Sequence, residues 1–176
     1  MTTTSPTAST IASPTASAAD ASDTASDAAS GVLARAEVAD LLARYLLSLD
    51  DEELDDAWAA ALFTPDAVVA FPISRHQGLD GMAAYHRAAL AAFAATQHLG
   101  SAALVVVDGE RATLRANLLS THVHHPQHAR PQAERAPLFA TGTFVDGAAR
   151  RTPQGWRLTL LSFRLLWAEG SPPPAA

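Results

Sequence analysis

Three residues far apart in the sequence carry side chains suited to acid–base catalysis: Asp50, His98 and His122. A carboxylate that accepts a hydrogen bond from an imidazole fixes the tautomer of the ring and stabilises the imidazolium, so the other ring nitrogen can take a proton from a substrate. A base positioned in this way is worth about 10²–10⁴-fold in rate. A second imidazole across a cavity could act as the acid, or could donate a hydrogen bond to a carbonyl.

Each of these residues also has a structural interpretation. Asp50 and Glu53 fit a D-x-x-E capping box that opens a helix. His98 could be a core histidine bonded to a backbone carbonyl. His122 lies in the cluster THVHHPQH, which could run into a solvated loop, and His122 with His124 could ligate a metal. No carboxylate ligand is evident beside these two histidines, so we expect neither a metal nor a cofactor.

Helices are predicted in the first half of the chain. Residues 32–50 form an amphipathic helix that ends at Asp50, with apolar side chains at helical spacing: Leu33, Val38, Leu41, Leu42, Tyr45 and Leu49. A shorter helix is predicted over residues 50–63, a short strand over 64–73, and a third helix over 78–95. TQHLGS (96–101) follows, so His98 stands where an apolar strand begins.

Strands are predicted in the second half. Residues 101–125 form a hairpin around an Asp-Gly turn, and segments 138–151 and 154–170 form a second strand pair. In the strand ERATLRANLLSTHVH, alternation places a row of residues on one apolar face: Ala112, Leu114, Ala116, Leu118, Ser120, His122 and His124. Ser120 and His122 therefore point inward. Helices followed by antiparallel strands predict the α+β class.

Composition limits the domain organisation and the partners. Residues 1–30 are almost wholly Ala, Ser, Thr, Asp and Pro, which predicts a disordered tail, and residues 171–176 form a second tail. The domain then spans residues 31–170. Of the net charge of −6, three negative charges lie in the first tail, so the domain carries about −3. Arginines scattered among acids argue against a nucleic-acid partner, and no apolar run is long enough for a membrane span.

The order of these elements, with the TQH segment and the closing GWR…LW…G pattern, resembles a SnoaL-like domain of the NTF2-like superfamily. The resemblance is greatest to the subgroup of scytalone dehydratase, bile-acid 7α-dehydratase and hexachlorocyclohexane dehydrochlorinase. It implies a cone: a strongly curved, mostly antiparallel sheet closed by about three helices around an internal pocket. It also implies that Asp50 orients His98 as the base, and that His122 matches the second histidine of scytalone dehydratase.

Departures from that family pattern shape the expected pocket. Leu49 and Phe71 stand where scytalone dehydratase has tyrosines, and Thr141 or Thr143 matches its serine. We expect an apolar pocket lined by substrate-binding side chains: Phe71, Leu118, Ser120, Phe144 and Trp167. Such a pocket suits an alicyclic, steroid-like or aromatic polyketide substrate.

The resemblance therefore implies a cofactor-independent lyase or isomerase. A non-catalytic small-molecule-binding module is the alternative, and a metal-dependent oxygenase is a further one. Relatives form dimers or trimers, and the last strand carries bulky residues on both faces, so we expect a homo-oligomer. The N-terminal segment is a poor secretory signal, and we expect a cytoplasmic protein.

Overall fold

The computed structural model describes residues 18–51, 53–125 and 138–172. Its first element is the helix α1 (Ala18–Asp51), and buried side chains recur along one side of it: Ala34, Val38, Leu41, Leu42, Tyr45 and Leu46. This confirms the amphipathic helix predicted over residues 32–50. Two short helices follow, α2 (Asp56–Leu62) and α3 (Met82–Leu90). None of the helices in the described part of the chain is long and apolar enough to cross a membrane.

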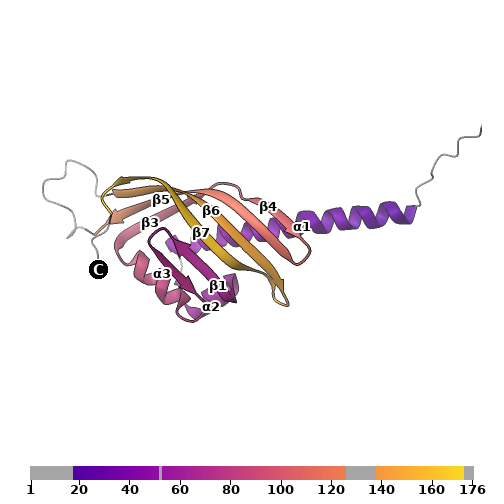
Figure 1. The fold of residues 1–176 in the computed structure, drawn as a ribbon, viewed down its shortest axis with the longest axis horizontal. Helices are drawn as coiled ribbons and strands as arrows, with labels where there is room; N and C mark the ends of the chain where they lie inside the picture. The colour runs from indigo at the N-terminus through magenta and orange to yellow at the C-terminus, as the bar shows by residue number, and fades with distance from the viewer. Residues whose placement is uncertain (1–17, 52, 126–137, 173–176) are drawn as a thin grey trace, which may run out of the picture.

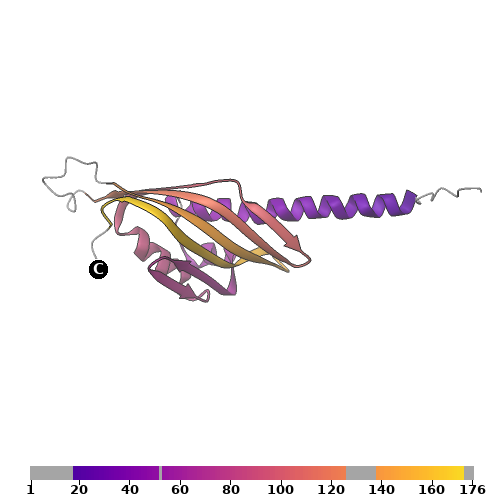
Figure 2. The ribbon, with the colours of Figure 1, turned by 45° about the horizontal axis from the view of Figure 1, so that its top comes forward.

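Helix α1 begins earlier than the sequence predicts. Residues 18–30 fall in the segment expected to be a disordered tail, but they are helical, and this part of α1 projects beyond the sheet (Figures 1 and 2). The prediction of disorder is therefore wrong for these residues. An alanine-rich segment cannot build a core, yet it can extend a helix that buried neighbours have already nucleated. Residues 1–17 and 173–176 of the two predicted tails lie outside the described residues.

Seven strands of the described residues form one curved sheet that does not close into a barrel (Figure 2). They are β1 (Phe63–Phe71), β2 (Ser74–Gln77), β3 (Phe93–Gly100), β4 (Leu104–Asp108), β5 (Arg111–His124), β6 (Leu138–Thr152) and β7 (Gly155–Gly170). Their order is β2-β1-β7-β6-β5-β3, and β4 also pairs with β5. Strands β1 and β7 run parallel, and the other pairs are antiparallel. The α+β class and the mostly antiparallel sheet are confirmed.

The helices cover one face of this sheet, which we call the inner face; the opposite, solvent-facing side is the outer face (Figure 1). Strand β5 shows the division most clearly, because its burial alternates residue by residue from Arg111 to Ser120. The buried positions are those predicted to point inward: Ala112, Leu114, Ala116, Leu118 and Ser120. The alternation that the sequence predicted for this strand is confirmed.

Two predicted elements differ from the structure. The third helix is shorter than expected, because α3 ends at Leu90 and residues 93–95 already belong to β3. His98 therefore lies within β3, which pairs with β5, and not at the start of the strand that contains Val105. Strand β2 was not predicted. Its sequence, SRHQ, has no apolar residue, and in the sheet it pairs only with β1.

Candidate active site

Asp50 and His98 meet where the last turn of α1 crosses β3. Oδ1 of Asp50 lies 2.6 Å from Nδ1 of His98, and the side chains are 19% and 7% exposed, respectively. An ionised carboxylate can only accept a hydrogen bond, so Nδ1 of His98 carries the proton. In the neutral ring, Nε2 then has no proton and can accept one through its lone pair. A pair of this kind can remove a proton from a bound molecule.

Strand β3 supplies two further donors to the same carboxylate. The backbone N–H of His98 donates to Oδ2 of Asp50 at 2.7 Å, and the hydroxyl of Thr96 donates to Oδ1 at 2.8 Å. Burial raises the pKa of Asp50, but the hydrogen bonds from His98 and Thr96 outweigh it and hold the pKa below its ordinary value. The role of Thr96 was not predicted from the sequence. The signal was its spacing of two from His98, which puts both side chains on one face of a strand.

Asp50 does not cap the second helix. Helix α2 begins at Asp56, and its N-cap is Asp55, whose carboxylate accepts a hydrogen bond from the backbone N–H of Trp58 at 2.7 Å. Asp50 lies inside α1. The capping box of Asp50 with Glu53 is therefore wrong. In a run of acidic residues, several positions offer the same capping pattern, and only the place where the chain leaves the first helix decides between them.

His122 lies beside His98, with its ring centroid 5.6 Å away. Its Nδ1 lies 3.1 Å from the carbonyl oxygen of Phe139, which can only accept, so this nitrogen carries the proton. Burial lowers the pKa of His122 by more than the bond to Phe139 raises it. A neutral His122 with a protonated Nδ1 presents Nε2 as an acceptor. The ring of Phe93 packs against it at a centroid distance of 4.4 Å.

Hydroxyl groups continue this cluster along the inner face. Ser120 is directly opposite His98 in the β3–β5 ladder, and Thr141 is opposite Ser120 in the β5–β6 ladder. Residues opposite one another on adjacent strands share a face, so an imidazole and two hydroxyls lie in one row. Thr143 lies on the same face, and its Oγ1 is buried with no hydrogen-bond partner in the described part of the chain.

Besides Ser120, two of the five predicted lining residues are on the inner side. Leu118 is 5% exposed and lies opposite Thr143. Phe71 packs against Phe163 at a centroid distance of 5.0 Å and stacks on Tyr85 at 5.7 Å. Phe71 therefore belongs to the packed interior, whereas Leu118 lies two positions from Ser120 on the same face of β5.

The remaining two of the five, Phe144 and Trp167, are on the outer face. Phe144 is opposite Arg164, whose guanidinium lies 4.8 Å from the ring centroid. Trp167 is opposite Gly142, and a Cβ at Gly142 would come within 2.3 Å of the indole, which therefore lies flat over β6. Register shifts in the β6–β7 ladder change which residues of β7 face inward. The prediction that Phe144 and Trp167 line the inner pocket is wrong.

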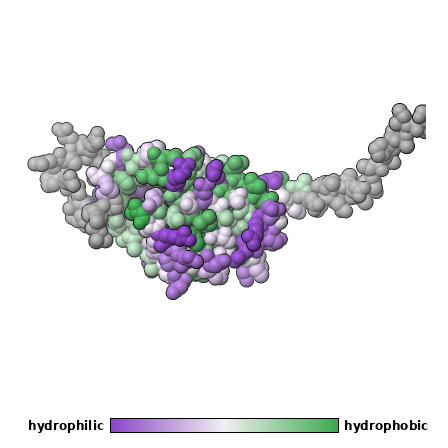
Figure 3. All heavy atoms as spheres, viewed as in Figure 1, coloured by the Kyte–Doolittle hydropathy of each residue, from purple (hydrophilic) through white to green (hydrophobic). Residues whose placement is uncertain are grey.

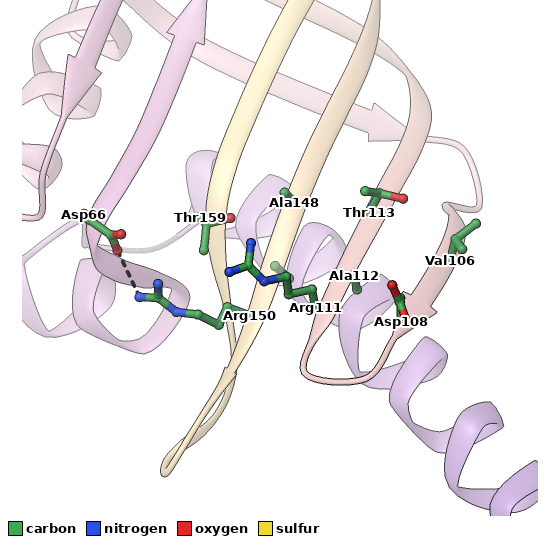
Figure 4. Close-up of a pocket in the computed structure, with 10 residues that line it drawn as sticks. Asp66, Val106, Asp108, Arg111, Ala112, Thr113, Ala148, Arg150 and Thr159 are labelled. Carbon is green, nitrogen blue, oxygen red and sulfur yellow. Dashed lines mark hydrogen bonds and ion pairs between the residues drawn. The ribbon is translucent and has the colours of Figure 1, made fainter.

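Two cavities lie on the described part of the chain at places other than the catalytic pair, since neither is lined by Asp50, His98 or His122. One has a volume of about 490 Å³ and lies where Arg111 and Arg150 extend across the outer side of the strands, with Arg150 paired to Asp66 (Figure 4). The other, of about 390 Å³, lies beside Trp167. The internal pocket expected at Asp50 and His98 is not among them.

The described residues contain no group of three or more potential ligands close enough to hold a metal ion. His122 and His124, the pair considered as ligands, each bond to a backbone carbonyl. Nε2 of His124 lies 2.8 Å from the carbonyl oxygen of Ser171, and Nδ1 of His122 bonds to Phe139. These bonds engage one nitrogen of each ring.

Comparison with known proteins places the chain in a family. Residues 30–162 match the model of the SnoaL-like domain, whereas no curated protein matches the sequence. The structure is similar to that of the Kfla4162 protein from Kribbella flavida, with a TM-score of 0.70 and 27% identity, covering 78% of this chain and 93% of that one.

Two further similar structures bear the names of enzymes. A candidate scytalone dehydratase from Novosphingobium aromaticivorans aligns with a TM-score of 0.65 and 19% identity over 82% of this chain and 92% of that one. A type 2 hexachlorocyclohexane dehydrochlorinase aligns with a TM-score of 0.65 and 16% identity over 82% and 90%. An NTF2-like protein from Salmonella enterica also shares the fold, with a TM-score of 0.64, 17% identity and coverage of 76% and 92%. The chain therefore belongs to the SnoaL-like domain family and has the fold of the NTF2-like superfamily.

Proposed function

We propose that this chain is a cofactor-independent lyase or isomerase of the dehydratase type, with Asp50 and His98 as its catalytic pair. The observation that carries the proposal is the 2.6 Å contact between Oδ1 of Asp50 and Nδ1 of His98, at side chains that are largely buried. Two similar structures have the names of a dehydratase and a dehydrochlorinase, and both names describe eliminations. A carboxylate–imidazole pair can supply the base that a proton abstraction requires, and here both side chains are largely shielded from solvent.

His98 acts as the general base in this mechanism. Its Nε2 takes a proton from a carbon next to the leaving group or next to an activating carbonyl, and the electron pair of the broken C–H bond forms the new double bond. The ring becomes an imidazolium, which the charge of Asp50 stabilises. In a dehydration, the C–O bond breaks and the departing oxygen takes the proton back from Nε2 of His98. The products are an alkene and water, and His98 is neutral again.

In this mechanism His122 does not act as the general acid. Its proton is on Nδ1 and bonds to Phe139, and its lowered pKa keeps the ring uncharged at neutral pH. Nε2 therefore accepts a hydrogen bond, from a hydroxyl of the substrate or from water. His122 then orients the substrate, and the proton for the leaving group comes from His98.

The substrate is a small, mainly apolar compound with at least one hydroxyl, of the alicyclic, steroid-like or aromatic polyketide kind. Apolar contact comes from Leu118 and from the ring of Phe93, which packs on His122. Ser120 and Thr141 supply hydroxyls in the row of His98. A few polar groups among apolar ones are typical of small-molecule sites.

The test is turnover of a panel of hydroxylated alicyclic and aromatic compounds, with loss of water followed by mass spectrometry. His98→Ala and Asp50→Asn should each lower turnover by about 10²–10⁴-fold. The control is His76→Ala, because His76 is an imidazole at an unrelated site whose Nε2 bonds to the carbonyl oxygen of Asp80. If all three variants turn over the same compound at the wild-type rate, the catalytic pair is refuted.

A non-catalytic binding module remains the second candidate, and one observation favours it. A cavity of about 390 Å³ beside Trp167 is lined mainly by apolar side chains and is not lined by Asp50 or His98, so a compound held there would not reach the pair. A binding module would retain a co-purifying compound unchanged, and His98→Ala would leave its affinity within a few-fold. If the wild-type protein converts that compound and the His98→Ala variant does not, the protein is an enzyme.

We also propose that a second copy of the chain covers part of the outer face. Large apolar side chains gather there on β3, β5 and β7, each 40–55% exposed: Leu99, Leu119, Leu166 and Trp167. In Figure 3, apolar residues lie in patches across the strand side, separated by hydrophilic ones. Oppositely charged groups also alternate on this face, as in the ion pair of Arg115 with Asp146 at 2.6 Å. A face that carries both signs of charge can match a copy of itself about a two-fold axis.

The oligomeric state can be measured by sedimentation. The wild-type protein should sediment as an oligomer, and Leu119→Ser with Trp167→Ser should shift it to the monomer. Ile73→Ser is the matched control, because Ile73 is 95% exposed at the turn after β1, away from this patch. A monomeric wild-type protein would refute the proposal.

A further inference from the structure

We propose that Thr96 is a positioning residue of the catalytic pair: its hydroxyl holds the carboxylate of Asp50 in the orientation that accepts the Nδ1 proton of His98. The inference rests on the proposed function for its catalytic meaning. The geometric part concerns the carboxylate alone and can be tested without a substrate.

All three hydrogen bonds to the carboxylate come from one short piece of β3. Oδ1 of Asp50 accepts both the Thr96 hydroxyl, at 2.8 Å, and Nδ1 of His98, at 2.6 Å. Oδ2 accepts the backbone N–H of His98 at 2.7 Å. The hydroxyl of Thr96 is thus the one side-chain donor, besides the imidazole itself, that fixes the rotation of the carboxylate in the described part of the chain.

The strand ladder makes this arrangement rigid. Thr96 is directly opposite His122, and His98 is opposite Ser120, within the continuous run of pairs between Ala95 and Gly100. Side chains two apart on a strand point to the same face. Threonine also has restricted rotation about χ1 because it is β-branched. Thr96 therefore presents its hydroxyl to Asp50 at a fixed distance from the imidazole.

The position of Asp50 explains why the carboxylate needs such support. Asp50 is the second-last residue of α1, and the C-terminal end of a helix carries a partial negative charge that disfavours another anion. The last turn of α1 has no basic residue, and Asp51 adds a second carboxyl group. Burial further disfavours the charged form, yet the pKa of Asp50 is lowered. The donors of β3 must therefore offset both effects, and Thr96 is one of them.

The experiment compares Thr96→Val, which keeps the shape but removes the hydroxyl, with Thr96→Ser, which restores it. Thr121→Val on β5 is the matched control, because Thr121 pairs with Gln97 and lies on the opposite face of the sheet from Thr96 and His98. The first measurement is the titration of the Asp50 carboxyl carbon by NMR. Thr96→Val should raise the pKa of Asp50 toward its ordinary value, whereas Thr96→Ser and Thr121→Val should leave it as in the wild type.

The second measurement is the tautomer of His98 from its ring nitrogen shifts. The wild type should show the proton on Nδ1, and Thr96→Val should show a mixture of tautomers, restored to Nδ1 by Thr96→Ser. With a substrate in hand, Thr96→Val should lower kcat about tenfold, the effect of one hydrogen bond to a charged group, with KM unchanged. If Thr96→Val does not fold, Thr96→Ala replaces it in the same comparison.

The outcomes separate this inference from the proposed function. An unchanged titration of Asp50 and an unchanged His98 tautomer in Thr96→Val would overturn the positioning role, whatever the turnover. Absence of turnover in the wild type, with the expected NMR changes in Thr96→Val, would refute the enzyme and leave the hydrogen bond of Thr96 to Asp50 established.

Discussion

The hydroxyl of Tyr45 lies 3.1 Å from Nε2 of His86, and both side chains are almost fully buried. Nδ1 of His86 lies 2.8 Å from the carbonyl oxygen of Met82, one turn earlier in α3, so Nδ1 carries the proton and Nε2 accepts from Tyr45. Aromatic rings enclose the pair, among them Trp58 at a centroid distance of 5.1 Å from His86. This hydrogen bond joins α1 to α3 inside the core.

Removing the tyrosine hydroxyl should weaken the fold. Tyr45→Phe leaves Nε2 of His86 buried without a donor, and we expect the free energy of unfolding to fall by about 1–3 kcal/mol. Urea denaturation followed by circular dichroism measures this change. Tyr85→Phe is the control: its hydroxyl bonds to Ser74 at 2.7 Å in an exposed position, so its loss should cost less than about 0.5 kcal/mol. Equal effects in the two variants would contradict this account.

Protonation of His86 should destabilise the protein in acid. Burial lowers the pKa of His86 to about 4 in the folded state, against an ordinary value of 6.5. Between these values the unfolded chain binds a proton that the folded chain excludes, so the free energy of unfolding rises with pH. The stabilisation is present above pH 6.5 and is lost as the pH falls toward 4, by about 3 kcal/mol in total.

The measurement is urea denaturation at a series of pH values between 7 and 4. His86→Gln cannot titrate and should lose part of the slope in this window, although it is less stable than the wild type at neutral pH. His76→Gln, at a half-buried site, should keep most of the slope, although the charge of His76 makes a small contribution to the lowered pKa of His86. A wild-type stability that is flat between pH 6.5 and 4.5 would show that His86 is not held neutral by burial.

The cap of α2 distinguishes Asp55 from its acidic neighbours. The carboxylate of Asp55 accepts the backbone N–H of Trp58 at 2.7 Å, whereas Glu53 is exposed and precedes the helix. Asp55→Ala should therefore lower the free energy of unfolding by about 1 kcal/mol. Glu53→Ala should change it by less than about 0.5 kcal/mol. Thermal denaturation of the two variants gives the comparison, and the reverse order would restore the capping box predicted for Glu53.

Periodicity predicted the elements whose core contacts follow a regular repeat. The buried side of α1 around Tyr45 and the alternation along β5 are both visible in the sequence, and alternation also turned Ser120 and His122 inward. The meeting of Asp50 with His98 came from a family resemblance. Nothing in the local pattern brings two residues 48 positions apart into contact.

Irregular pairing between strands explains why the inward-facing residues of β7 could not be predicted from the sequence. Leu158 and Leu161 are both fully buried, although strict alternation puts them on opposite faces, because the β6–β7 ladder shifts register between them. A second shift, near Gly142, turns Trp167 to the outer face. Bulges depend on the partner strand, so a single strand's pattern does not predict them. The same applies to residues 93–95, where alanine-rich sequence suits either a helix or a strand.

Thr143 offers a test of the inner face as a site for a ligand. Its hydroxyl is buried without a hydrogen-bond partner in the described part of the chain, and an unpaired buried hydroxyl costs about 1–3 kcal/mol. Thr143→Val keeps the shape and removes that cost, so it should raise the free energy of unfolding by about 1 kcal/mol. Thr64→Val is the control, because the buried hydroxyl of Thr64 reaches the carbonyl oxygen of Leu158 at 3.4 Å and its loss should not stabilise.

The same variant links stability to function. Thr143 lies on the inner face opposite Leu118, two pairs along the ladder from Ser120 and Thr141. If the hydroxyl of Thr143 binds the substrate, Thr143→Val should be more stable than the wild type but should turn over substrate more slowly. The reason is that a ligand-binding site retains a polar group that lowers the stability of the protein without ligand. Thr143→Ser should keep both properties near those of the wild type. A Thr143→Val variant that is less stable than the wild type would mean that the hydroxyl already has a partner within the protein, and would remove Thr143 from the site.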